Sequence, residues 1–218
     1  MTGLLIKDWK LLKNQGRFFV LVLIFTLFFL IVGASSYTGF MTSYMTFVFS
    51  IFVLSTLSYD SYDNGMAFLM ALPVSRKIYI KEKYVFGLLL IFGSWLLTMF
   101  ARQLVYCLSI SPVDNSGLLQ IDLIYLFIVL LFIAYSLPVR IKFGAEKGQM
   151  ISFCTLGVFA FSIFFLARSP LFREKLLVVL SVFLTSSWKI LGGMFLLCAV
   201  IWCISYKLSV KILEKQEF

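Results

Sequence analysis

Residues able to do chemistry are sparse in this chain, and they form no recognised catalytic set. The 218 residues include no histidine, which removes the most common metal ligand and the side chain that titrates near neutral pH. Neither a GxSxG nucleophile elbow nor a GxxxxGK[ST] phosphate loop occurs. Tyr59 and Asp60 form a YD pair of the kind used by intramembrane aspartyl proteases, but the companion GxGD motif is missing. The sequence therefore predicts no catalytic, metal-binding or cofactor-binding residue in this chain.

One charge, Arg102, stands well apart from the clusters of charged loop residues. It follows Tyr84 by 18 residues, or about 27 Å along a helix, which places it near the outer interface of a membrane span. An arginine in that position either extends its side chain to the lipid headgroups or contacts a substrate at the outer mouth. The sequence leaves both interpretations open.

Composition shows what kind of element must carry these residues. The chain is 61% hydrophobic and 13% charged, with a mean hydropathy of +1.01, whereas a soluble domain is about 45–50% apolar and about 25% charged. This predicts an all-α integral membrane protein folded as one transmembrane domain over residues 1–218. The net charge of +9 reflects sidedness rather than nucleic-acid binding, because short cytoplasmic loops collect Lys and Arg.

Uncharged stretches define the predicted spans. Residues 18–59 carry no charge, and a single helix of that length would measure about 63 Å, twice the thickness of the membrane core. The chain must therefore turn back, and the small polar residues of 33–39 mark the turn. With the later apolar stretches this predicts six transmembrane helices, at residues 18–34, 38–58, 76–109, 122–139, 148–167 and 188–207.

Two further segments frame these spans. Residues 1–17 place apolar and basic side chains on different helical faces, which predicts an amphipathic interfacial helix or a basic flank that orients the first span. Leu176–Trp188 is uncharged but too short to span, and it is interpreted as an outer-surface or a re-entrant helix. Fourteen of the 19 Lys and Arg then fall on one side, which predicts cytoplasmic N- and C-termini.

The segment 61–74, between the second and third predicted spans, is more than a loop. Polar residues suited to a helix start precede a short apolar run, and Pro73 ends it because the residue before proline avoids the α region. This predicts a short cytoplasmic helix, either an interfacial re-entry helix or a docking element that passes a partner's motion to both spans. The contact residues would be Asp63, Met66, Phe68, Leu69, Leu72, Pro73 and Arg76.

A second turn, at 140–149, has its own polar pattern. Arg140 and Lys142 are expected at the membrane surface, and Gly144 and Gly148 permit a tight turn. Glu146 and Lys147, the next charged residues, are free to make polar contacts. The turn is either a solvated, inside-positive connection or a contact site.

Three stretches resemble the compact ABC-2-type transporter permeases. They are MTGLLIKDWKLLKNQ at 1–15, LPVSRKIYIKEKYVFGLL at 72–89 and LPVRIKFGAEKGQMI at 137–151. DNGMAF at 63–68 lacks the extra charges that the family has there. The resemblance covers nearly the whole chain, and it implies that two six-helix chains pair as a homodimer or heterodimer. It also implies that a separate ATPase subunit, holding ATP and Mg, serves each chain.

The same resemblance assigns roles to both turns. Segment 61–74 would be the ATPase-coupling helix, and Arg140, Lys142, Phe143, Glu146 and Lys147 would make a second cytoplasmic contact. The expected function is that of an exporter permease in a bacterial plasma membrane, moving a lipophilic or amphipathic cargo such as a peptide. The alternatives are a stand-alone secondary transporter, which the scarcity of mid-membrane carboxylates disfavours, and a non-transporting immunity or scaffold protein.

Overall fold

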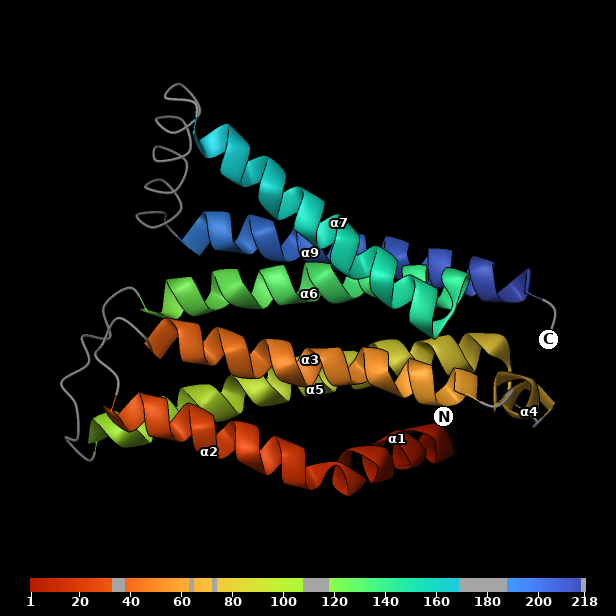
Figure 1. The fold of residues 1–218 in the computed structure, drawn as a ribbon, viewed down its shortest axis with the longest axis horizontal. Helices are drawn as coiled ribbons and strands as arrows, with labels where there is room; N and C mark the ends of the chain where they lie inside the picture. The colour runs from red at the N-terminus through yellow and green to blue at the C-terminus, as the bar shows by residue number, and fades with distance from the viewer. Residues whose placement is uncertain (33–37, 63–64, 72–73, 108–117, 169–187, 217–218) are drawn as a thin grey trace.

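The computed structural model describes residues 1–32, 38–62, 65–71, 74–107, 118–168 and 188–216, and all regular structure in these ranges is helical. The helices, shown in Figure 1, are α1 (Thr2–Asn14), α2 (Gly16–Val32), α3 (Thr38–Ser61), α4 (Gly65–Ala71), α5 (Arg76–Cys107), α6 (Leu118–Phe143), α7 (Ala145–Ala167) and α9 (Trp188–Glu214). The expected all-helical fold is confirmed for this part of the chain.

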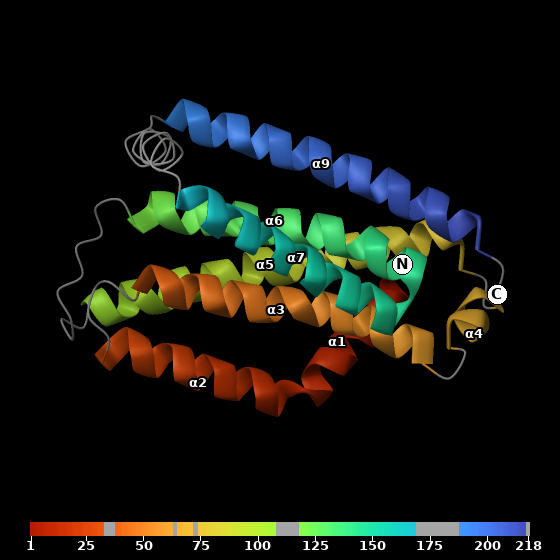
Figure 2. The same cartoon turned by 45° about the horizontal axis from the view of Figure 1, so that its top comes forward.

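Helices α3, α5, α6 and α9 run side by side and form the centre of the molecule (Figures 1 and 2). Their shared apolar interior includes Val53, Ile91, Ile133, Leu137 and Leu213, all essentially inaccessible to solvent. Helix α2 packs on α3, and α7 contacts α6 near their junction before it diverges from the bundle. Each helix satisfies its own backbone hydrogen bonds, as a lipid environment demands.

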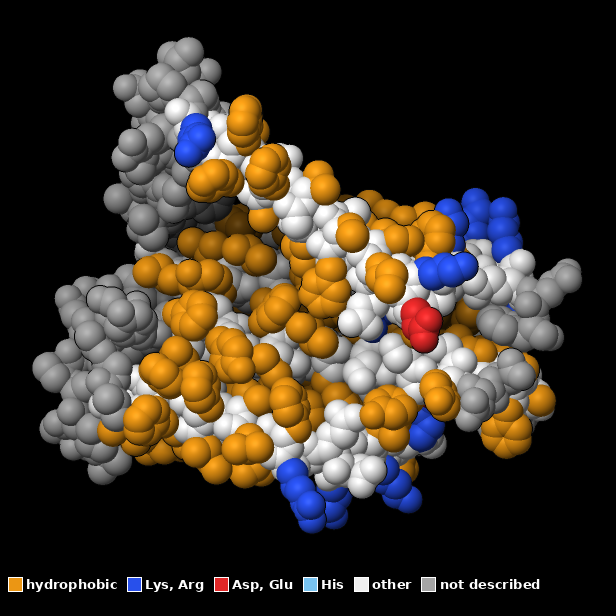
Figure 3. All heavy atoms as spheres, in the orientation of Figure 1, with side chains coloured by type: hydrophobic (Ala, Val, Ile, Leu, Met, Phe, Trp, Pro, Cys, Tyr) orange, Lys and Arg blue, Asp and Glu red, His pale blue; other side chains and the backbone are white. Residues whose placement is uncertain are grey.

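One end of the bundle gathers most of the features described below. It contains α1, α4, the α6–α7 turn and the C-terminal end of α9, together with Met1 and Gln216 (Figures 1 and 2). We call it the α4 end, and the opposite end the far end. In Figure 3 most of the visible Lys and Arg side chains lie at the α4 end, whereas apolar side chains cover the flanks of the helices.

Five helices are long and apolar enough to cross a membrane: Phe40–Ser61, Arg76–Val105, Leu119–Phe143, Ala145–Leu166 and Gly192–Glu214. Thr2–Asn14 and Gly16–Ile31 are bent by 63° at their junction, and together they would make a sixth span. The described chain therefore has five or six candidate spans where the sequence predicts six. The difference in number concerns α2, because its 17 residues are fewer than a normal span needs. The protein is a multi-pass membrane protein.

Several helices extend beyond the ends of the predicted spans. Helix α3 continues to Ser61, α6 continues through Pro138 to Phe143, and α9 continues to Glu214. Charged residues end an apolar pattern, but they do not end a helix, because Lys, Arg and Glu are good helix formers. Asp63, Leu72 and Pro73, and residues 176–187 of the predicted Leu176–Trp188 segment, lie outside the described residues.

Candidate functional site

Helix α4 joins α3 to α5 and presents an aromatic ring at the α4 end (Figure 1). Phe68 is 70% exposed, whereas Met66, Leu69 and Met70 pack against the apolar core. The helix is thus held on one side and open on the other. The structure separates two residues that the sequence treated alike, since Phe68 is available for contact and Leu69 serves mainly as an anchor.

Gly65, the first residue of α4, lies too close to the end of α3 for a side chain. A Cβ atom at Gly65 would lie 2.8 Å from the backbone oxygen of Asp60, a distance that real Cβ atoms do not reach. Glycine is therefore required there, and the orientation of α4 is fixed relative to the end of α3.

The α6–α7 turn lies next to α4 and is equally tight. Gly144 has a φ of +81°, a conformation that glycine adopts without strain. A Cβ at Gly148 would lie 2.7 Å from the Cα atom of Arg140, so α7 starts in close contact with the end of α6. Glu146 and Lys147 are exposed between these two glycines.

Two hollows connect the α3 end, α4 and the α6–α7 turn. One, of about 260 Å³, is lined by Leu57, Ser61, Met66, Arg140, Ile141, Gly144, Ala145 and Gln216. The other, of about 500 Å³, is lined by Ser58, Ser61, Tyr62, Phe143, Gly144, Ala145, Glu146, Lys147 and Gln149. The structure thus brings the two predicted contact segments together. We call the exposed side chains of Tyr62, Phe68, Phe143, Glu146 and Lys147 the docking surface.

Two of the predicted contact residues, Arg76 and Arg140, make hydrogen bonds within the chain. Arg140, expected at the surface, is buried, and its Nη1 donates to the Leu54 carbonyl at 2.9 Å. Arg76 donates to the Leu213 and Glu214 carbonyls at 3.2 and 2.7 Å, where a helix C-terminus leaves carbonyls unpaired. These arginines tie α6 to α3 and α5 to α9, so the docking surface rests on a fixed base. Lys142 is exposed, with its Nζ 5.0 Å from the centre of the Phe143 ring.

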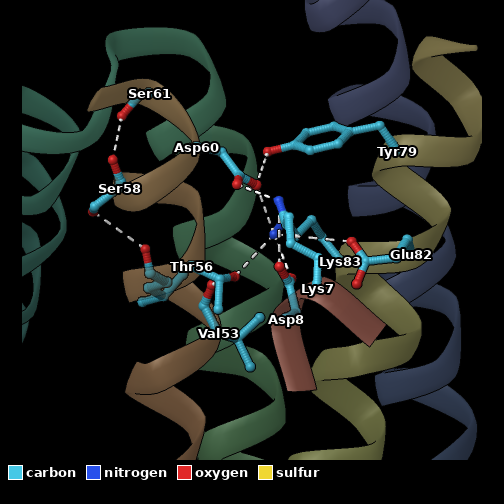
Figure 4. Close-up of polar contacts among 11 residues, drawn as sticks. Lys7, Asp8, Val53, Thr56, Ser58, Asp60, Ser61, Tyr79, Glu82 and Lys83 are labelled. Carbon is cyan, nitrogen blue, oxygen red and sulfur yellow. Dashed lines mark hydrogen bonds and ion pairs between the residues drawn. The ribbon is translucent and has the colours of Figure 1, made fainter. Parts of the chain in front are cut away.

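A buried charge cluster joins α1, α3 and α5 (Figure 4). Lys83 on α5 directs its ammonium group to Asp8 Oδ2 at 2.5 Å, Asp60 Oδ2 at 2.8 Å and Thr56 Oγ1 at 3.1 Å. The side chains of Lys83 and Asp8 are wholly inaccessible to solvent. Three acceptors match the three protons of an ammonium group, which is the condition for burying its charge.

Further contacts extend the cluster to α1. Lys7 forms a hydrogen-bonded ion pair with Asp60 and lies 3.4 Å from Asp8 Oδ1. The Tyr79 hydroxyl donates to Asp60 Oδ2 at 2.9 Å. We use the name charge cluster for Lys7, Asp8, Asp60, Tyr79, Glu82 and Lys83. The charge cluster joins α1 to α3 and α5, the two helices that flank α4, and it fixes these three helices relative to one another.

The sequence analysis did not find this cluster. Charged residues in the first turns of a membrane helix are usually solvated, whereas Tyr79, Glu82 and Lys83 of α5 are buried. One signal was available: Tyr79 and Lys83 are spaced i, i+4 and share a helical face. Asp60 near the end of α3 and Asp8 in the middle of α1 supply the opposite charges, but their convergence is a tertiary feature that no local pattern shows.

At the far end, Arg102 has a partner within the chain. Its Nη1 lies 2.6 Å from Asp122 Oδ2, and both side chains are buried between α5 and α6. The structure thus gives Arg102 an acidic partner within the chain, which neither of the two interpretations from the sequence included. Lys83 and Arg102 are 19 residues apart, or roughly 28 Å along α5, so the two ion-pair sites are separated by about one membrane core.

These features define a multi-pass helical membrane protein with a short, anchored helix exposed at one end. The chain belongs to the ABC-2 family of transporter proteins, since the family model described as "ABC-2 family transporter protein" matches residues 3–214. The matched region includes every helix described above apart from the first residue of α1. No curated protein and no solved structure matches the chain. Membrane components of ABC-2 transporters typically have no catalytic activity of their own, and the family in general works with an ATPase.

Proposed function

We propose that this chain is the transmembrane permease subunit of an ATP-binding-cassette exporter in a bacterial plasma membrane. A separate ATPase subunit binds ATP and Mg, and its closing drives the motion. The observation that carries the proposal is the exposure of Phe68 on a short helix whose two flanking spans are joined by the charge cluster. A displacement of α4 would therefore move α3 and α5 together.

Charge distribution supports a cytoplasmic position for the α4 end. Fourteen of the 19 Lys and Arg belong to segments at this end, and short cytoplasmic loops carry such an excess. The docking surface and both termini would then face the compartment that holds ATP. A docking surface facing outward would have no access to an ATPase.

The chemistry of the docking surface fits a protein groove. Tyr62 and Phe68 offer two largely exposed aromatic rings, and aromatic side chains are enriched among the residues that dominate binding energy. Glu146 and Lys147 line the same hollow as Tyr62 and would form a polar rim. We expect the Phe68 ring to enter an apolar pocket of the ATPase while the rim fixes its register.

Helix α7 offers apolar surface for lipid, cargo or a second permease subunit. Only 6% of an 18-residue apolar stretch within Ala145–Leu166 is buried by the rest of the chain. The exposed side chains of α7 include Phe159, Phe161, Phe164 and Phe165. Such surface suits a path for lipophilic or amphipathic cargo, with amphipathic peptides as the class we propose. A pair of permease chains would enclose that path.

The proposal is tested by the substitution Phe68→Asp, with Phe68→Tyr as the matched control. The permease is co-expressed with its candidate ATPase subunit and purified in detergent. We expect Phe68→Asp to weaken ATPase binding at least about 30-fold, the loss of a hot-spot residue, while the permease stays monodisperse. Phe68→Tyr should bind nearly as the parent does. Unchanged binding in Phe68→Asp would contradict the proposal.

A further inference from the structure

Glu82 is buried in the charge cluster without a hydrogen-bond partner among the described residues. Its side chain is wholly inaccessible to solvent, and neither carboxyl oxygen is bonded. The closest cation is Lys83, with its Nζ 3.9 Å from Glu82 Oε2. That ammonium group already directs its protons to Asp8, Asp60 and Thr56 (Figure 4), so Glu82 receives no hydrogen bond from it.

The formal charges of the cluster do not balance. Asp8, Asp60 and Glu82 carry three negative charges when ionised, whereas Lys7 and Lys83 carry two positive charges. One negative charge is therefore in excess, and although Lys7 is 33% exposed, the side chains of Asp8 and Glu82 are inaccessible to water. A buried, unpaired charge is strongly unfavourable, and a single bound proton removes it.

Glu82 is the place for that proton, because Asp8 is the carboxyl group next to it. Asp8 Oδ1 also lacks a hydrogen bond, and the Asp8 side chain acts directly on the Glu82 carboxyl. Two carboxyl groups that share a buried site do not both remain ionised, because like charges repel. We propose that Glu82 holds one proton, directed toward Asp8, while α1 is packed against α5.

Among the described residues, only Lys83 lies within ion-pair distance of Glu82. Helix α3 contributes Asp60, which is already paired, and α5 itself contributes Tyr79 and Lys83. Arg17 on α2 is exposed, and Glu214 on α9 pairs with Lys77 at 3.6 Å.

The bound proton has a mechanical consequence. Asp8 belongs to α1 and Glu82 to α5, so a shared proton holds the two helices together. Loss of the proton would leave two carboxylates facing each other and would favour separation of α1. The site thus couples protonation to the docking of α1, and this inference does not depend on the exporter function.

Infrared spectroscopy of the full chain in lipid nanodiscs at neutral pH tests the site. A protonated carboxyl group gives a carbonyl band distinct from that of a carboxylate. We expect this band in the parent protein and in Glu146→Gln, which alters an exposed glutamate. We expect Glu82→Gln to lose one carboxyl's intensity. Asp8→Asn should lose it as well, because either substitution balances the charges without a proton. A parent protein without the band, or a band that persists in both cluster variants, would overturn the proposal.

Thermal unfolding as a function of pH gives an independent readout. A proton bound by the folded chain and released on unfolding makes stability fall as the pH rises. For one proton, the unfolding equilibrium constant of the parent should rise about tenfold per pH unit relative to that of Glu82→Gln. Equal pH dependence in the two proteins would overturn the proposal, even where the spectra are weak.

Discussion

The substitution Lys83→Met tests whether the charge cluster holds α1, α3 and α5 together. Methionine keeps an unbranched, flexible chain of similar length but carries no charge. Asp8 then loses its hydrogen bond from Lys83, whereas Asp60 keeps Lys7 and Tyr79 as partners. Removal of one member of a buried ion pair costs about 3–5 kcal/mol, because the remaining charge is uncompensated.

This cost converts into a measurable temperature. For a chain of this length, 1 kcal/mol shifts the melting temperature by roughly 2–4 °C, so Lys83→Met should melt about 6–20 °C below the parent protein. The assay is thermal unfolding in detergent, followed by tryptophan fluorescence. Lys77→Met is the matched control, because Lys77 lies on the same helix with an exposed side chain and a loose pair to Glu214. An exposed pair contributes at most about 1 kcal/mol.

A double substitution separates the ion pair from simple packing. Lys83→Met combined with Asp8→Leu removes both charges and should recover most of the lost stability, since apolar residues often replace a buried ion pair without cost. The reasoning is refuted if Lys83→Met melts at the temperature of Lys77→Met. It is also refuted if the double variant is less stable than Lys83→Met alone.

Two further predictions concern the α6–α7 turn and the far end. Gly148→Ala should destabilise the chain by about 1–3 kcal/mol, because its Cβ would meet the Arg140 backbone. Gly157→Ala, which meets nothing within 4 Å, should be neutral in the same melting assay, and equal effects of the two would contradict this reasoning. Arg102→Met should lower stability by about 3–5 kcal/mol by leaving Asp122 buried and unpaired, and Arg102→Met with Asp122→Leu should restore it. No recovery in the double variant would show that the pair is not the cause.

The helices were largely accessible to sequence reasoning, because span length and lack of charge are local properties. Helix α3 begins at Thr38, where the small polar turn ends, and α5 begins at Arg76, just after Pro73 and Ser75. The short helix at Gly65–Ala71 lies within the segment predicted for it, although its role as a coupling helix remains a proposal.

The fate of the charged residues was not accessible. Arg140 was expected at the membrane surface because charges near the end of a span are usually solvated, yet Arg140 is buried, and so is Lys83 near the start of α5. Their burial depends on which helix ends converge, and that is decided by packing across the whole bundle. Helix α1 illustrates the same limit. It exposes Trp9, as an interfacial helix would, and it also buries Asp8 in the cluster.

The central claim is that a separate ATPase binds α4 through Phe68. The most direct measurement places a photo-crosslinking amino acid at Phe68 in cells that co-express the ATPase. A second permease with the same label at Phe161, an exposed residue of α7, serves as the control. The account predicts a permease–ATPase adduct from position 68 and none from position 161. An ATPase that co-purifies with the permease but gives no adduct from position 68 would contradict it.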